Sequence, residues 1–119
     1  MNGINFPDAH ATVEALGDAA TYNVAIADAF TIVKRTGGLS QAVTGLSLTA
    51  SKDLRIGSKV KVDIAQGATG RNVTFGSAGS TIVAPALTGV ASDRDTISLT
   101  WDGVAFVADG VWGKIVDAA

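Results

Sequence analysis

The sequence contains no cysteine, only two prolines and a single histidine among its 119 residues. Without cysteine the chain can form neither a disulfide bond nor a thiolate metal site, and it has no cysteine nucleophile. The redox state of its compartment therefore cannot be inferred from thiols. The only histidine, His10, precedes the residues expected to form strands, so a histidine-dependent catalytic triad is not expected.

Charged residues are also scarce, because Asp, Glu, Lys and Arg make up 17% of the chain and the formal net charge is -2. An average soluble domain has roughly a quarter of its residues charged. Only Lys34 and Arg35 are adjacent basic residues, whereas nucleic-acid binding needs clustered Lys and Arg. We therefore expect no nucleic-acid partner, and we expect an oligomer that covers part of this weakly charged surface.

Signals for export and membrane insertion are missing as well. No basic residue precedes Lys34, and no apolar run approaches the roughly 18 residues that a membrane-spanning helix requires. The sequence thus predicts a soluble protein without a signal peptide and without a membrane partner.

The residues that are abundant favour strands. Val, Ile and Thr supply 33 positions, whereas the chain has one Glu and two Gln for the polar faces of helices. One short helix is predicted from Asp8 to Leu16, between Pro7 and Gly17. Elsewhere, alternation of apolar and polar residues predicts short strands near residues 22–26, 30–32, 46–49, 59–64, 72–75, 80–83 and 97–101.

Three reversals of the chain are predicted from glycine-containing turns. The glycines of Gly76–Gly79 are expected to adopt positive φ and to join residues 72–75 and 80–83 as a hairpin. Asp102-Gly103 predicts a two-residue type I′ turn with positive φ at both positions. Asp109-Gly110 is expected to form another such hairpin, so the C-terminal third is predicted to be a meander.

These elements predict an all-β protein with about eight or nine short strands. Because the crossover helices of a parallel α/β sheet are missing, we expect a single small antiparallel sandwich or barrel that is jelly-roll-like. The sequence shows no repeat of fixed period. Residues 1–20 are interpreted as an N-terminal arm that holds the short helix, and residues 21–119 as the β domain.

The N-terminal arm, together with the residues up to position 28, differs in charge from the rest of the chain. Residues 1–28 contain four carboxylates and no basic residue, whereas residues 29–119 have more basic than acidic residues. The arm is either a solvated terminal segment or an attachment arm that docks on a neighbour. Its candidate attachment residues are Ile4, Phe6, Asp8, Glu14 and Asp18.

No residue is assigned a catalytic, metal-binding or cofactor-binding role. Ser40 lies in a near match to the Gly-x-Ser-x-Gly nucleophile elbow, but no strand-to-helix turn of a parallel sheet is expected there, so we interpret it as a loop serine. Four aspartates of the C-terminal half could supply calcium ligands, yet EF-hand spacing is missing and turn formation explains them better. These aspartates are Asp93, Asp95, Asp102 and Asp109.

The aromatic residues suggest two alternatives. Tyr22, Trp101, Phe106 and Trp112 could form a platform on which a sugar ring stacks. Trp101, however, alternates in register with other apolar residues and is predicted to lie in the core. Trp112 alternates out of phase with its neighbours, so Val111 and Trp112 are predicted to belong to an oligomer interface.

Two segments resemble the small β modules of tailed-bacteriophage structural proteins. One runs from Lys52 to Gly76 and ends in Asn-Val-Thr-Phe-Gly, and the other runs from Thr96 to Gly103 and ends in Trp-Asp-Gly. The resemblance covers residues 20 to 116. It implies a head fibre, a capsid decoration protein or a tail-fibre domain, and such modules are often trimers.

Composition and resemblance together predict a non-enzymatic bacteriophage virion protein. We expect a capsid head-fibre or decoration (cement) protein, a homotrimer that binds the major capsid protein, with no cofactor. Its expected location is the virion, and the host cytoplasm during assembly. The alternative is a tail-fibre module that binds a receptor or a host surface glycan, and a hydrolase is the third and least supported class.

Overall fold

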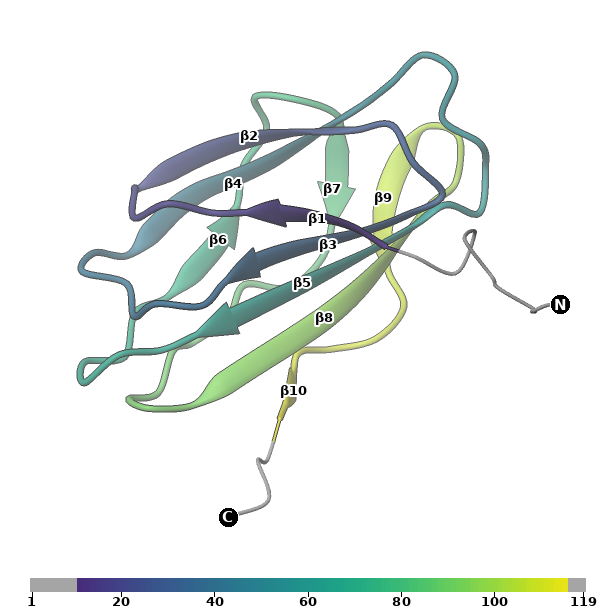
Figure 1. Cartoon of the computed structure of the whole chain (residues 1–119). Helices are drawn as coiled ribbons and strands as arrows, with labels where there is room; N and C mark the ends of the chain where they lie inside the picture. Colours follow the sequence, from purple (N-terminus) through teal and green to yellow (C-terminus); the bar gives the residue numbers. More distant parts are fainter. Residues whose placement is uncertain (1–10, 116–119) are drawn as a thin grey trace, which may run out of the picture.

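The computed structural model describes residues 11–115. All the regular secondary structure in this range consists of β-strands (Figure 1). The all-β class predicted from the sequence is confirmed. No helix capable of crossing a membrane occurs among these residues. The ten strands are β1 (Thr12–Ala15), β2 (Thr21–Ile26), β3 (Phe30–Arg35), β4 (Val43–Ala50), β5 (Lys59–Ala65), β6 (Val73–Phe75), β7 (Thr81–Val83), β8 (Arg94–Trp101), β9 (Ala105–Ala108) and β10 (Gly113–Lys114).

The strands form two sheets around one hydrophobic core. The large sheet has the order β1-β3-β5-β8-β9-β7, with β10 also paired to β8, and the small sheet has the order β2-β4-β6. Side chains from both sheets contribute to the same buried cluster, so the sheets face each other. In Figure 1 the strands β1, β3, β5 and β8 form the front layer, and β6 and β7 lie behind them.

The first six strands wind between the two sheets. The chain passes from the large sheet to the small sheet and back three times, so β1, β3 and β5 are parallel neighbours, as are β2, β4 and β6. Each strand therefore pairs with the strand one full winding later, as when Thr12 pairs with Thr31. The remainder is largely antiparallel, because β8 runs against β5, β9 and β10, although β7 is parallel to β9.

The antiparallel sandwich or barrel predicted from the sequence is not confirmed. Parallel neighbours need a crossover connection, and helices usually provide it. In this protein a strand of the opposite sheet provides the crossover, so parallel pairing requires no helix. The offset between paired residues also changes, from Thr12 with Thr31 to Phe30 with Lys59, and for this reason no fixed repeat is visible in the sequence.

Alternation along each strand directs apolar side chains into the core. On β5, Val60, Val62 and Ile64 are buried, and each such side chain contributes about 1.5–3 kcal/mol when fully removed from water. Trp101 is 9% exposed and its ring lies 4.7 Å from that of Phe106, which confirms the prediction that it is a core residue.

The helix predicted from Asp8 to Leu16 is wrong over Thr12–Ala15, which form strand β1; residues 8–10 lie outside the described range. The strand pairs along its whole length with β3, and the Leu16 N–H continues the ladder by donating to the Lys34 carbonyl at 2.8 Å. Thr12 and Val13 are β-branched and prefer this conformation. Residues 12–15 of the expected arm are thus part of the large sheet.

The hairpin predicted around Gly76–Gly79 is also wrong. β6 belongs to the small sheet and β7 to the large sheet, so this loop connects the sheets rather than two paired strands. Neither glycine has positive φ. They are needed for close approach, because a Cβ would lie 2.4 Å from Ser47 Oγ at Gly76 and 2.3 Å from Thr49 Oγ1 at Gly79.

The turn between β8 and β9 joins antiparallel strands as predicted, but its centre is shifted by one residue. The pairing of Trp101 with Phe106 and the hydrogen bond from Asp102 N–H to the Ala105 carbonyl leave Gly103 and Val104 as the central residues. Only Gly103 has positive φ, at 100°, so the predicted type I′ geometry is wrong.

Asp109-Gly110 does not form a hairpin either. β9 and β10 pair with successive parts of the same edge of β8 and not with each other, and the Asp109 N–H donates to the Ser98 carbonyl at 2.9 Å.

Candidate functional site

The outer face of the large sheet carries an apolar group next to unpaired lysines. Val13 and Phe30 are 57% and 39% exposed, and Ile32 between them is half-buried. The register places Val13 beside Ile32 and Ile32 beside Lys61, while Lys34 follows on β3. Neither lysine is in an ion pair with another residue of the 11–115 range. We call Val13, Phe30, Ile32, Lys34 and Lys61 the lysine face.

A buried carboxylate lies beside this face. Asp63 on β5 is 3% exposed and accepts two hydrogen bonds from Arg94, at 2.9 Å from Nε and 2.6 Å from the terminal nitrogen. These bonds, together with the charges of Arg94, Lys34 and Lys61, hold the pKa of Asp63 below its usual range despite burial. Alternation along β5 places Asp63 on the outer side of the sheet, but its carboxylate is buried because the Arg94 guanidinium covers it.

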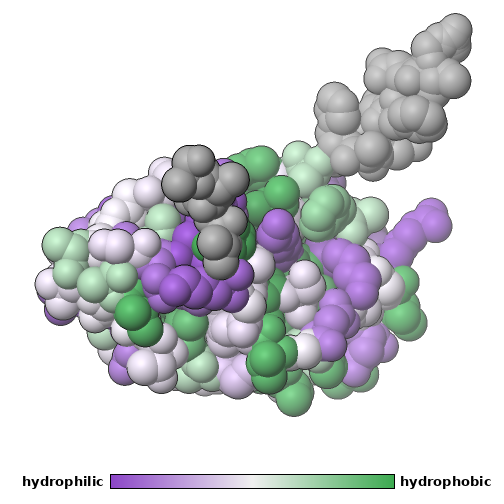
Figure 2. All heavy atoms as spheres, turned by 90° about the horizontal axis from the view of Figure 1, so that it is seen from below, coloured by the Kyte–Doolittle hydropathy of each residue, from purple (hydrophilic) through white to green (hydrophobic). Residues whose placement is uncertain are grey.

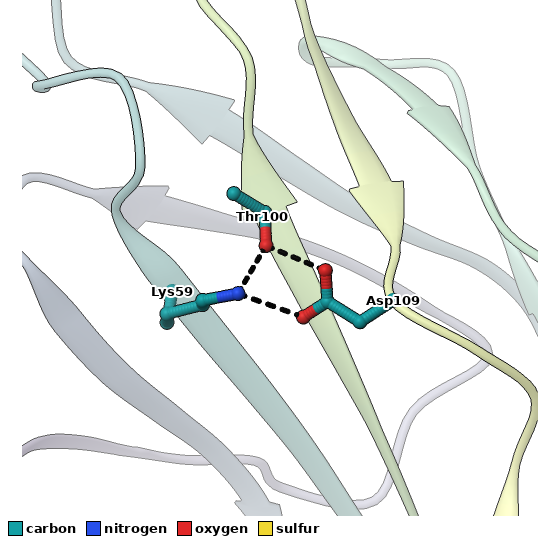
Figure 3. Close-up of polar contacts among 3 residues, drawn as sticks. All are labelled: Lys59, Thr100 and Asp109. Carbon is teal, nitrogen blue, oxygen red and sulfur yellow. Dashed lines mark hydrogen bonds and ion pairs between the residues drawn. The ribbon is translucent and has the colours of Figure 1, made fainter.

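A second polar cluster on the same side joins β5, β8 and the residue that follows β9 (Figure 3). Lys59 Nζ donates to Thr100 Oγ1 at 2.6 Å and to Asp109 Oδ2 at 3.1 Å, and Thr100 Oγ1 donates to Asp109 Oδ1 at 2.6 Å. The bonds from Thr100 and Lys59 lower the pKa of Asp109. Through these bonds the cluster forms a contact between neighbouring strands of the large sheet.

The small sheet carries an open groove of about 510 Å³ on its outer face. None of the described residues that line the groove is charged. Thr21 and Asn23 of β2, Gly45 and Ser47 of β4, and Ser77 of the following loop supply hydroxyl, amide and backbone groups. Part of this polarity is already used, because the Ala78 N–H donates to Ser47 Oγ at 3.1 Å and Thr49 Oγ1 donates to Asn23 Oδ1 at 2.7 Å.

The aromatic platform considered from the sequence does not form. Trp101 and Phe106 pack against each other in the core with their ring planes tilted by 45°, whereas Trp112 stacks on Phe75 with ring centres 5.9 Å apart. The Trp112 indole N–H donates to the Pro85 carbonyl at 2.9 Å. The Tyr22 hydroxyl donates to the Gly17 carbonyl and accepts the Ala19 N–H. The polar groups of Tyr22 and Trp112 are therefore engaged within the chain.

The residues predicted for an oligomer interface differ in exposure. Val111 is 79% exposed, but Trp112 is half-buried against the core cluster. Their role in an interface stays a prediction.

Of the predicted attachment residues, Glu14 lies on β1 and Asp18 in the connection to β2, while Ile4, Phe6 and Asp8 lie outside the described residues, as does His10. Ser40 donates to Asp18 from its hydroxyl, at 2.5 Å, and from its N–H, at 3.2 Å. These bonds lower the pKa of Asp18. Ser40 therefore links the β3–β4 connection to the β1–β2 connection, in agreement with its interpretation as a loop serine.

The four aspartates considered as calcium ligands do not converge, since no group of metal-ligating side chains is found within residues 11–115. Asp102 Oδ1 accepts the N–H groups of Val104 and Ala105 at 2.8 and 2.7 Å, which caps the turn and lowers the pKa of Asp102. Asp93 is in an ion pair with Lys114 at 3.0 Å.

Sequence reasoning missed the lysine face and the groove. The face arises because β1 joins the sheet that was expected to begin only after it, and the groove arises because the β6–β7 loop lies against β4. Both depend on parallel pairing, which alternation alone does not reveal. Comparison with protein families, curated proteins and solved structures finds no match to this chain.

Proposed function

We propose that this chain is a non-enzymatic structural protein of a bacteriophage virion, of the head-fibre or capsid decoration type. In this proposal it forms a homotrimer that attaches to the major capsid protein. The phage assignment is supported by the resemblance of the Lys52–Gly76 and Thr96–Gly103 segments to phage β modules.

The lysine face is the structural observation that supports an assembly role. Exposed Val13 and Phe30 next to the unpaired charges of Lys34 and Lys61 form a surface suited to protein contact, because apolar contact contributes affinity while lysines select an acidic counterpart. The face of the molecule seen in Figure 2 carries hydrophilic and hydrophobic residues in several separate groups.

Locating the protein in purified phage particles by cryo-electron microscopy tests the proposal. Density on the capsid supports it, density on the tail alone favours a tail-fibre module, and absence from the particle overturns it. Light scattering tests the trimer: a mass near three chains is expected, whereas a single species near 12.0 kDa at micromolar concentrations contradicts it.

The uncharged groove supports a second candidate, a tail-fibre module that binds a neutral glycan. Its volume suits a small ligand, and its hydroxyl and amide groups match those of a sugar. A Cβ at Gly45 would lie 3.6 Å from Thr21 and 3.9 Å from Gly76, so Gly45→Val fills the groove without a clash at Cβ.

Glycan-array binding that is lost in Gly45→Val and retained in Gly110→Val is the result expected for this candidate. Gly110 has no atom within 4 Å of a Cβ and lies outside the groove, which makes it the matched control. No binding by the unmodified protein, or equal binding by both variants, removes the glycan candidate.

A further inference from the structure

The free edge of β2 is the least protected strand edge in the described part of the chain. The large sheet ends at β1 and β7, and the small sheet ends at β2 and β6. Three of these edges are short and protected. β6 has three residues, and Val73 pairs on its outer side with Leu87. β7 has three residues and is followed closely by Pro85, and β1 has four residues, one of which is the charged Glu14. β2 has six residues without a charge, a proline or a bulge.

Three residues of β2 present unpaired backbone groups along this edge. The Ala20 carbonyl accepts the Gly45 N–H and the Ile26 carbonyl accepts the Ser51 N–H. The backbone N–H and C=O groups of the even-numbered residues of β2 therefore point toward β4. Thr21, Asn23 and Ala25 therefore direct their N–H and C=O groups away from the sheet. No hydrogen-bond partner of these groups occurs within the described residues.

Natural proteins usually protect such an edge with charge, proline, a bulge or a covering segment, because an open edge binds other strands. The missing protection at β2, beside three protected edges, indicates that this edge is covered when the protein is in its working assembly. A six-residue strand spans roughly 20 Å, which is long enough for specific strand addition.

The charges at the two ends of β2 indicate what kind of strand fits. Asp18 precedes the strand and Asp28 follows it, and neither carboxylate is in an ion pair within the described residues. Each is held in place by a hydroxyl, Asp18 by Ser40 and Asp28 by Thr12 at 2.7 Å. An antiparallel β2–β2 pair between two copies would bring Asp18 of one copy near Asp28 of the other, which is unfavourable.

We propose that the edge of β2 binds an extended strand of a partner protein that has a Lys or Arg at each end and alternating apolar residues between them. The basic ends would pair with Asp18 and Asp28, and the apolar residues would cover Leu16 and Tyr22, which lie half-buried at this margin of the core. The inference deepens the proposed virion function, on which it rests, by naming the attachment contact.

A synthetic peptide, acetyl-KVTVTVK-amide, tests the site on the full-length protein by NMR. We expect saturable shifts at β2 and at least tenfold slower amide hydrogen exchange at Thr21, Asn23 and Ala25 when the peptide is bound. An EVTVTVE peptide, with the opposite end charges, should bind at least tenfold more weakly. A KVTVTVK peptide N-methylated at every valine and threonine lacks free N–H groups on both edges between its lysines and should not bind.

Ala25→Pro removes one unpaired N–H without breaking the β2–β4 ladder, and it should weaken peptide binding at least tenfold. Ala25→Val keeps that N–H and is the matched control, which should bind as the unmodified protein does. The proposal is overturned if the N-methylated peptide binds as well as the unmethylated KVTVTVK peptide, or if hydrogen exchange at the three amides does not change. Both results are obtained on the unmodified protein.

Two further results would show which part of the proposal is wrong: the identity of the partner, or the strand site as distinct from the virion function. If the three amides are already protected at high concentration and become exposed on dilution, the edge binds a second copy and the proposed partner is wrong. If the peptide fails to bind while the protein is found on phage particles, only the strand site is wrong; if it binds but particles lack the protein, the virion function is wrong.

Discussion

Single residues decide how stability responds to pH, and two aspartates act in opposite directions. Asp63 is buried against Arg94, which lowers its pKa, whereas burial and the neighbouring Asp93 raise the pKa of Asp95. An aspartate whose pKa is lowered in the folded state stabilises the fold at neutral pH, and this stabilisation is lost as the pH falls through the folded-state pKa. An aspartate whose pKa is raised in the folded state stabilises the fold at low pH, and this stabilisation is lost as the pH rises through the folded-state pKa.

Asp63→Asn is therefore expected to lower the unfolding free energy at pH 7 by about 1–3 kcal/mol, the lower part of the range being favoured because the Arg94 side chain is 35% exposed. Asp95→Asn should instead raise Tm at pH 7 by a few degrees. Thermal melts from pH 7 down to pH 3 should show both differences shrinking. If the stability difference between a variant and the unmodified protein does not change with pH, the direction of the pKa shift assigned to that aspartate is wrong.

The turn between β8 and β9 depends on Gly103. Its φ is 100°, and a Cβ there would lie 3.1 Å from Ile56 Cδ1, so Gly103→Val should cost about 1–3 kcal/mol and lower Tm. Asp102→Asn keeps an oxygen that can accept the Val104 and Ala105 N–H groups and should change Tm much less. If Asp102→Asn lowers Tm as much as Gly103→Val does, the charge of Asp102 contributes as much to the turn as the positive φ of Gly103.

At the level of strands, the contact between the β6–β7 loop and β4 positions the small sheet. The Gly76 N–H donates to the Leu46 carbonyl at 2.8 Å, and the Ser80 N–H donates to the Leu48 carbonyl at 2.7 Å. The loop therefore continues the pairing of the short strand β6 along β4.

Gly76→Ala is expected to disrupt this contact, since its Cβ would lie 2.4 Å from Ser47 Oγ and 3.0 Å from the Gly45 Cα. We expect a loss of about 1–3 kcal/mol in urea unfolding. Gly45→Ala is the matched control from the facing strand, because its Cβ meets only ordinary contacts. If Gly45→Ala destabilises the protein as much, close approach is not the reason for glycine at position 76.

Strand positions were largely predictable from the sequence, but strand partners were not. Alternation identified Val60–Ile64 and Ile97–Trp101 as strands, because the buried face of each is apolar. Alternation is the same in parallel and antiparallel strands, so it could not show that β3 pairs with β5. Glycines predicted as turn residues at positions 76 and 79 instead allow close packing, a property that only the paired structure reveals.

The edge of β2 could not be identified from the sequence either, although its residues were predicted as a strand. Whether an edge is free depends on the order of the strands in the sheet, which sequence patterns do not encode.

For the whole molecule, the winding places long stretches of chain between paired residues. Parallel partners such as Phe30 and Lys59 lie in different windings, so about 20–30 residues must be closed into a loop before each parallel ladder forms. We expect folding in milliseconds to seconds. Stopped-flow fluorescence of the two tryptophans, of which Trp101 is buried against Phe106, measures this rate, and folding within microseconds would contradict the topology.

The order of the strands also has a consequence during protein synthesis. When the ribosome has translated the three windings through β6, β8 does not yet exist, so β5 is temporarily an edge of the large sheet. Its outward side chains Lys59, Lys61 and Asp63 are charged, and charge on an edge opposes pairing with other nascent chains. We therefore expect the charges that later bind Arg94, Thr100 and Asp109 to oppose aggregation of the unfinished chain.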